Sequence, residues 1–252
     1  MIVNFFNFSK TISRGEEKHF KIRFNEILIE EMGKQFDLKP LHLDPAFLEQ
    51  YPENDKSVFI KSRYLDCPKT SGIRTGQLDL KGSMLIQFAN LPPARNYDIP
   101  ILGYTFVYAN KCLIVVLDLL PVARDKDYID CYLASLKDIQ KKYDWIPRLE
   151  GSREEVSEWT KPYDSGYSIY RWCDKEYIPA MENAFRDYIQ VFRDCVNKAE
   201  PLTDPERRSR RNAHMERYIN DYLEKDVGGA PLKSHFGKEW GERYMKEFFF
   251  SP

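Results

Sequence analysis

The residues best suited to metal or redox chemistry are scattered through this sequence without the spacing of a metal-binding or redox motif. None of the cysteines forms a CxxC pair, so we expect neither a disulfide framework nor an iron–sulfur cluster; they are Cys67, Cys112, Cys131, Cys173 and Cys195. The histidines lack any spacing that would bring two onto one helix face as metal ligands; they are His19, His42, His214 and His235. No glycine-rich loop of the dinucleotide-binding type follows a predicted strand, which argues against a bound nicotinamide. We therefore expect no metal site, no iron–sulfur cluster and no bound nicotinamide.

Two aspartates occupy positions where a carboxylate is unfavourable. Asp118 interrupts the apolar run 112–120, and a lone acid in such a strand is interpreted as a hydrogen-bonded structural group. Asp226 follows the predicted end of a helix, where the helix dipole disfavours negative charge. By position alone Asp226 is interpreted as a solvated residue at the end of a helix. An acid is less expected by chance there than at the amino end of a helix.

The charge balance excludes a general attraction to nucleic acid or to an anionic membrane. Lys plus Arg number 38 against 39 Asp plus Glu, for a net charge of -1, so a charged partner must meet a local patch. The densest basic cluster lies in one predicted helix and comprises Arg207, Arg208, Arg210 and Arg211. Its alternative interpretation is a solvated helix face. No apolar run reaches the length of a membrane span.

The chemistry-bearing positions depend on a series of closely spaced strands. Segments 58–65, 73–80, 84–91, 101–108 and 113–119 each have strand length and are separated by Gly, Pro or Asn. Links this short predict an antiparallel meander, because parallel crossovers need a dozen or more residues.

Helical periodicity dominates the second half. Apolar stripes predict helices over 128–143, 181–196 and 205–225, and a shorter one over 26–36. Thr203 and Glu206 are placed to form a capping box at the start of the third, and the segment 235–250 is amphipathic. Strands followed by helices predict α+β or a three-layer α/β/α sandwich with a central antiparallel sheet flanked by helices. We expect one domain over residues 1–252.

Three segments together resemble the ferredoxin-dependent bilin reductases: NYDIPILGYTFV, LIVVLDLLPV and KDVGGAPLKSHFGKEWGERYMKEFFF. The resemblance covers roughly residues 58–252, and its carboxy-terminal aromatic pattern is the most specific part. It implies a linear tetrapyrrole held between a central antiparallel sheet and the carboxy-terminal helices. It also implies electrons delivered singly by a reduced [2Fe–2S] ferredoxin, with no flavin, metal or nicotinamide on the enzyme. The enzyme's own task is then to supply protons, which suits carboxylates in an apolar pocket.

The resemblance also implies roles for individual residues. Asp226 matches the family's carboxy-terminal acid and Asp79 an acidic strand position; the alternative for Asp79 is an outward-facing strand residue. The family commonly has an Asp where this chain has Thr105. The family's His or Asn on the preceding strand falls on Phe88 in an ungapped match or on Asn90 after a small shift. Candidates to pair with the propionates or dock ferredoxin are proposed on charge type: Lys225, Arg171 and Arg148 for the propionates, and Arg207, Arg208, Arg210 and Arg211 for ferredoxin.

A protein with Asp226 but without the central acid resembles an A-ring reductase, so the leading expectation is conversion of 15,16-dihydrobiliverdin to phycoerythrobilin. Such an enzyme could receive its substrate from an upstream bilin reductase. The alternatives are reduction of biliverdin itself, action on another open-chain tetrapyrrole, and a non-catalytic bilin carrier. We expect a cytoplasmic protein, or a plastid stromal one if a transit peptide has been removed.

Overall fold

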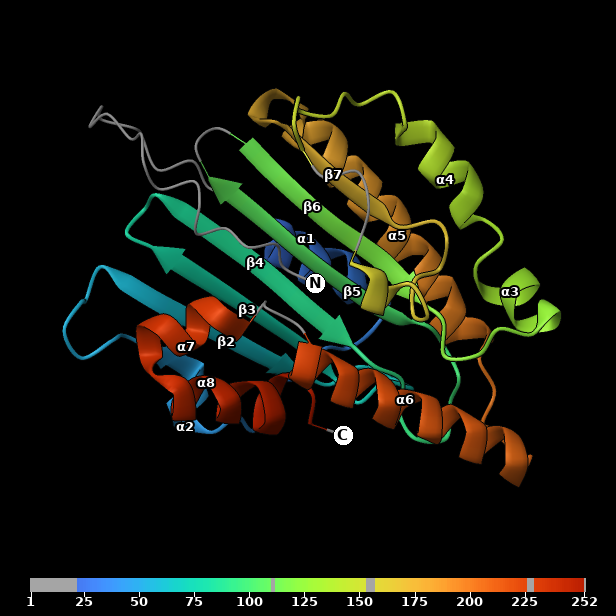
Figure 1. Cartoon of the computed structure of the whole chain (residues 1–252). Coiled ribbons are helices and arrows are strands. Elements are labelled where there is room, and N and C mark those ends of the chain that lie inside the picture. Colours follow the sequence, from blue (N-terminus) through green and yellow to red (C-terminus); the bar gives the residue numbers. More distant parts are fainter. Residues whose placement is uncertain (1–21, 110–111, 153–156, 226–228, 252) are drawn as a thin grey trace.

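The computed structural model describes residues 22–109, 112–152, 157–225 and 229–251 (Figure 1). Its centre is a seven-stranded sheet whose spatial order follows the chain, β1 to β7. Every neighbouring pair is antiparallel. The strands are β1 (Glu49–Gln50), β2 (Val58–Leu65), β3 (Ile73–Leu80), β4 (Met84–Leu91), β5 (Ile101–Ala109), β6 (Cys112–Leu120) and β7 (Ile169–Asp174). The predicted antiparallel meander is thus confirmed.

The strand bounds agree closely with the alternation and turn signals in the sequence. The first three predicted strands have the bounds of β2, β3 and β4, while β5 and β6 each extend slightly beyond the predicted ends. Strands β1 and β7 were not predicted. The former has two residues, and β7 is a six-residue strand without strict alternation of polar and apolar residues, so neither carries a strong local signal.

One face of the sheet is covered by α1 (Phe24–Gly33) and α5 (Ile178–Lys198), which lie behind the strands in Figure 1. The stripe predicted over 181–196 is buried along its length in α5. Aromatic rings lock these layers together: Phe24 stacks on Phe106 with centroids 3.5 Å apart, and Phe185 meets Phe106 edge-on at 5.2 Å. The predicted helix 26–36 begins and ends slightly later in sequence than α1 does.

Two local predictions about helices were wrong. The stripe over 128–143 forms two helices, α3 (Lys126–Tyr132) and α4 (Leu136–Tyr143), because a turn at Leu133 lets both short segments bury their aromatic residues. Helix α6 has the expected bounds, Pro205–Lys225, but its start is capped by Asp204 instead of the Thr203 capping box. The Asp204 carboxylate accepts a hydrogen bond of 2.9 Å from the Glu206 amide.

The opposite face is covered by α6 and by the carboxy-terminal elements, with α2 (Pro45–Leu48) beside them (Figure 1). These elements are α7 (Ala230–Phe236), α8 (Lys238–Arg243) and the π-helical turn η5 (Tyr244–Phe249). The π-helical turn seats Tyr244 and Phe248 against Phe47 of α2. Helices on both faces of a central antiparallel sheet confirm the predicted three-layer arrangement.

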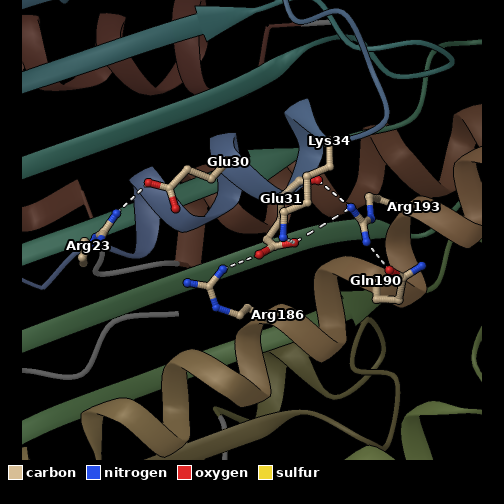
Figure 2. Close-up of polar contacts among 7 residues, drawn as sticks. All are labelled: Arg23, Glu30, Glu31, Lys34, Arg186, Gln190 and Arg193. Carbon is tan, nitrogen blue, oxygen red and sulfur yellow. Dashed lines mark hydrogen bonds and ion pairs between the residues drawn. The ribbon is translucent and has the colours of Figure 1, made fainter.

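A buried carboxylate fastens α1 to α5 (Figure 2). Glu31 is 8% exposed and pairs with Lys34 at 2.6 Å and with Arg186. Arg193 donates to the Glu31 carbonyl at 2.7 Å. Burial by itself raises the pKa of Glu31, but the hydrogen bonds and charges of Lys34 and Arg186 outweigh it, so the pKa is lowered overall. On the face covered by α1 and α5, called the closed face below, the buried negative charge of Glu31 is therefore compensated by neighbouring cations.

Candidate functional site

The site is built on rows of residues that run across the sheet beneath α6. In one row Asn90 of β4 lies opposite Gly103 of β5, which lies opposite Asp118 of β6. In the adjacent row on the same face, Phe88 lies opposite Thr105. The strict alternation of side chains along a strand places all of these positions toward α6, away from α1 and α5.

A cavity lies between these rows and α6. It holds about 530 Å³ of empty space, including its open mouth. Its floor includes Asn90, Thr105 and Asp118, and its walls are largely aromatic; the wall residues are Trp159, Tyr163, Tyr218, Tyr222 and Phe249. This size and lining are typical of a pocket for a flat, largely apolar molecule that a few polar groups orient.

Asp118 is buried at the floor of this cavity, 2% exposed. One of its carboxylate oxygens accepts a hydrogen bond of 2.9 Å from the Ser165 amide, and the other accepts one from the Ser165 hydroxyl. Burial, and next the charge of Asp164, raises the pKa of Asp118 to about 7, although the bonds from Ser165 oppose the shift. Asp118 can therefore exchange a proton near neutral pH, beyond the structural role that the sequence indicated.

Asn90 lies beside a second cavity of about 760 Å³, which includes its open mouth. Its side chain is 3% exposed. The amide nitrogen donates weakly to the Phe249 carbonyl at 3.5 Å, and the amide oxygen has no hydrogen-bond partner. An unpartnered buried acceptor is unfavourable, so Asn90 is suited to accept a hydrogen bond from an N–H group of a bound molecule.

Phe88 packs within the hydrophobic layer, away from the cavity surface. It lies over Gly76, where a Cβ atom would come within 2.2 Å of the Phe88 ring, and against Phe249 with centroids 5.3 Å apart. Of the two positions that the sequence left open, Asn90 is the one at the cavity, and Thr105 lies diagonally across from it.

Asp79 lies away from this site. It is near the end of β3, in the register that points to the opposite face from Asn90, and its carboxylate accepts a hydrogen bond of 2.8 Å from the Gly82 amide in the following turn. The structure thus places Asp79 beside a hairpin turn and away from the cavity.

The cations proposed for the propionates are dispersed. Arg171 is buried on the face away from the cavity, where its guanidinium donates to the Ile146 carbonyl and pairs with Asp144 at 3.1 Å. Arg148 donates to the Tyr170 carbonyl at 3.0 Å. Neither residue is brought to the pocket. Lys225 is exposed and pairs with Asp221 at 2.6 Å.

The four arginines proposed for ferredoxin divide into two pairs. Arg211 is 5% exposed and donates to the Pro93 carbonyl at 2.6 Å, so it cannot be presented to a partner. Arg207 pairs with buried Asp98 at 2.6 Å. Arg208 and Arg210 are exposed on α6. Two of the four, Arg207 and Arg211, therefore stabilise the fold, because one side of α6 packs its cations against the loop that follows β4.

The sequence analysis did not identify the loop that closes the cavity, which contains Trp159 and Tyr163. The phenol of Tyr163 donates a hydrogen bond to Asp221 of α6, and Trp159 meets Tyr222 edge-on at 5.6 Å. Burial, followed by the bond to Asp221, raises the pKa of Tyr163 to about 12. Nothing in the sequence pairs this loop with α6, apart from its aromatic content.

The predicted acid Asp226 lies outside the described residues. Within the ranges that the structure describes, no group of three or more His, Cys, Asp or Glu side chains could hold a metal ion. The same part of the chain contains no helix that is both long enough and apolar enough to cross a membrane.

Comparisons with known proteins identify the family of this chain. Residues 25–251 match the family model described as ferredoxin-dependent bilin reductase. The 15,16-dihydrobiliverdin:ferredoxin oxidoreductase of Nostoc punctiforme is 29% identical over 90% of this chain and 93% of its own length. The phycoerythrobilin:ferredoxin oxidoreductase of the same organism is 24% identical, with 90% and 91% covered.

Phytochromobilin synthase from tomato, solved in complex with biliverdin, has the same fold. The TM-score is 0.79 at 20% identity, and the match covers 90% of this chain and 81% of the tomato chain. The family match spans nearly all of the sheet and the helices described above. The chain therefore belongs to the ferredoxin-dependent bilin reductases, oxidoreductases that reduce a bilin with electrons from ferredoxin.

Proposed function

We propose that this enzyme reduces biliverdin itself, adding two electrons and two protons across the 15,16 bridge to give 15,16-dihydrobiliverdin. Two reduced ferredoxins supply the electrons, one at a time, and are oxidised. The proposal replaces the A-ring reaction as the leading hypothesis. Because biliverdin is then the substrate, no upstream bilin reductase is required.

The cavity beneath α6 is the observation that carries this proposal. Its aromatic walls suit the flat tetrapyrrole, and the unpartnered oxygen of Asn90 suits a pyrrole N–H. Asp118 lies in the same row of the sheet as Asn90, with only Gly103 between them. Hydrogen-bonding and ionisable groups thus lie under one face of the expected substrate.

The relatives favour this reaction over the A-ring alternative. Similar proteins named 15,16-dihydrobiliverdin:ferredoxin oxidoreductase come from several cyanobacteria, including Gloeobacter violaceus at 26% identity over 90% of this chain. Thr105 is the feature that favours the A-ring alternative, because a threonine cannot replace the carboxyl group of the family's central acid.

Ferredoxin docking is proposed at the exposed part of the arginine cluster. Arg208 and Arg210 remain accessible on α6. Replacing both with Glu should weaken ferredoxin-driven turnover steeply at low salt and little at high salt, because salt screens the attraction. Unchanged kinetics at low salt would remove this surface from the proposal.

The reaction is tested with purified protein, biliverdin and 15,16-dihydrobiliverdin in separate anaerobic assays, each started with reduced ferredoxin. We expect biliverdin to be consumed, with the long-wavelength band moving to shorter wavelength as conjugation is interrupted at the bridge. Consumption of the dihydro compound alone would establish the A-ring reaction. A coloured complex that electrons never change would favour the carrier function.

Asp226 remains a predicted proton donor on family grounds. Asp226→Asn should slow turnover at saturating bilin without weakening bilin binding. Turnover equal to that of the wild type would remove Asp226 from the mechanism.

A further inference from the structure

Asp118 is the only carboxylate among the described residues that line the cavity beneath α6. It lies on β6, which is paired on both sides, and no lysine or arginine is among those lining residues. A buried carboxylate without a neighbouring cation is unfavourable in its ionised form. The surroundings of Asp118 therefore favour a neutral carboxyl group.

Of the groups around Asp118, the charge of Asp164 also favours the neutral carboxyl group, whereas the two hydrogen bonds from Ser165 favour the ionised one. From the loop before β7 come Asp164, whose negative charge acts on Asp118, and Ser165, which donates both hydrogen bonds. One oxygen of Asp164 is buried without a hydrogen-bond partner. From α5 comes Tyr188, whose phenol donates to the Tyr167 carbonyl. From α6 come the cavity-lining phenols of Tyr218 and Tyr222.

We propose that Asp118 is a catalytic acid that protonates the bound bilin, and that Asp164 is a positioning residue that keeps Asp118 protonated. This inference rests on the proposed function. It assigns the proton supply to the strand that neighbours Thr105, where the family's usual acid is missing. Asp118 supplies the proton instead, because Gly103, which lies between Asp118 and Asn90, has no side chain that would cover Asp118 on the cavity side.

The step balances as follows. One electron passes from reduced ferredoxin to the bilin, whose basicity rises. The O–H bond of Asp118 breaks and the proton forms a new bond to the bilin, which leaves Asp118 as a carboxylate. A proton from solvent water restores it, and the second ferredoxin electron and a second water-derived proton complete the reduction.

The first test is Asp118→Asn, which keeps the size of the side chain and a hydrogen-bond acceptor for the Ser165 amide. General acids contribute about 10²–10⁴-fold, so we expect at least a 100-fold loss of kcat with bilin affinity changed by less than about threefold. The matched control is Asp174→Asn, an exposed aspartate at the end of β7. Equal kcat in Asp118→Asn and wild type would overturn the proposal.

The second test separates positioning from a purely structural role. Asp164→Asn removes the charge that holds the proton on Asp118. The alkaline limb of the pH–kcat profile should therefore move to lower pH by about half to one unit, while the rate on the acid side is preserved. A uniform loss of rate at every pH would overturn the role of Asp164.

Infrared difference spectra keep this proposal separable from the choice of substrate. The C=O band of a protonated carboxyl should shift when biliverdin binds wild type, and this shift should be absent in Asp118→Asn. If wild type reduces neither bilin, the proposed function fails, and the infrared spectra then decide whether Asp118 faces the ligand. A carboxyl band that biliverdin does not perturb would overturn the assignment.

Discussion

The two faces of the sheet bury similar side chains but satisfy their polar groups differently. Beneath α1 and α5, Asn25 accepts from the Tyr104 phenol at 2.7 Å and donates to the Gly76 carbonyl at 3.0 Å, and aromatic rings fill the remaining space. Beneath α6 a cavity remains, and the amide oxygen of Asn90 has no hydrogen-bond partner. Asp118 lies near a second acid, Asp164, whose negative charge acts on it.

This difference separates residues that stabilise the fold from those available for chemistry. On the closed face the Asn25 side chain is accommodated because its amide nitrogen and its oxygen both form hydrogen bonds within the protein. On the open face the same groups are left for a ligand, at a cost in stability that the rest of the fold must offset. Substitutions on the closed face should mainly affect folding, and substitutions on the open face should mainly affect turnover.

The largest effect on stability is expected from Phe185→Ala. Phe185 is fully buried among Phe24, Tyr104 and Phe106, so the cavity created should lower the free energy of unfolding by about 3–5 kcal/mol. Phe249→Ala on the open face is the comparison, and it should cost less because a cavity already adjoins that ring. Urea denaturation measures both. Equal losses would contradict the proposed difference between the faces.

The next effect concerns Asp118 and pH. Its pKa is raised from 3.8 to about 7, so the folded protein retains a proton that the unfolded chain releases, and stability falls as pH rises through this window. Asp118→Asn removes this contribution. The variant should therefore gain stability relative to wild type from pH 4 to pH 8, by up to about 4 kcal/mol.

Denaturation curves of both proteins across that pH range test this prediction. The difference between the two proteins isolates Asp118 from the other titrating groups. A difference that is the same at pH 4 and pH 8 would show that Asp118 is ordinarily acidic, and would weaken its proposed role as a proton donor.

A smaller effect is expected at the charge cluster in Figure 2. Glu31→Gln leaves Arg186 and Arg193 without their buried counter-charge and should cost about 2 kcal/mol. The control is Glu30→Gln, whose pair with Arg23 is about half exposed and should contribute less than about 1 kcal/mol.

The pH dependence of this cost follows from the lowered pKa of Glu31. Its stabilisation is present above the pKa of the unfolded carboxyl and is lost as pH falls through the folded value. The difference between wild type and Glu31→Gln should therefore shrink toward pH 3. Persistence of the full difference there would contradict the ionic account.

The smallest effect is expected from Asp79→Asn. Asn retains an oxygen that can accept the Gly82 amide bond, so both stability and kcat should change little, with kcat within about twofold of wild type. A large loss of kcat would return Asp79 to the mechanism despite its distance from the cavity.

Much of the sheet could be predicted because its signals are local. Strands β2 to β6 alternate and are separated by short turns, so their order and antiparallel pairing follow from chain connectivity. Helix α6 ends as predicted because Gly and Pro follow Lys225 within a few residues. The family resemblance depended on motifs of the same local kind.

The site could be predicted only in part. The sequence placed Asn90, Thr105 and Asp118 on neighbouring predicted strands, and the family resemblance singled out Thr105, which lines the floor of the cavity. It could not show that Arg171 points to the other face of the sheet, because that depends on the register of β7. It also could not show that the Arg211 guanidinium donates to a loop carbonyl, because that depends on how α6 packs against the sheet.

The sequence by itself determined the order of the strands, the long helices and the family, because propensity, alternation and turn residues act over a few positions. Only the tertiary structure decided which aspartate lies at the cavity. Asp79 and Asp118 both lie in strands, but the pleat turns the first away from α6 and the second toward it, and a loop distant in sequence brings Asp164 and Ser165 to Asp118. Burial and neighbouring charge set the chemistry of a carboxyl group, and both are properties of the folded chain.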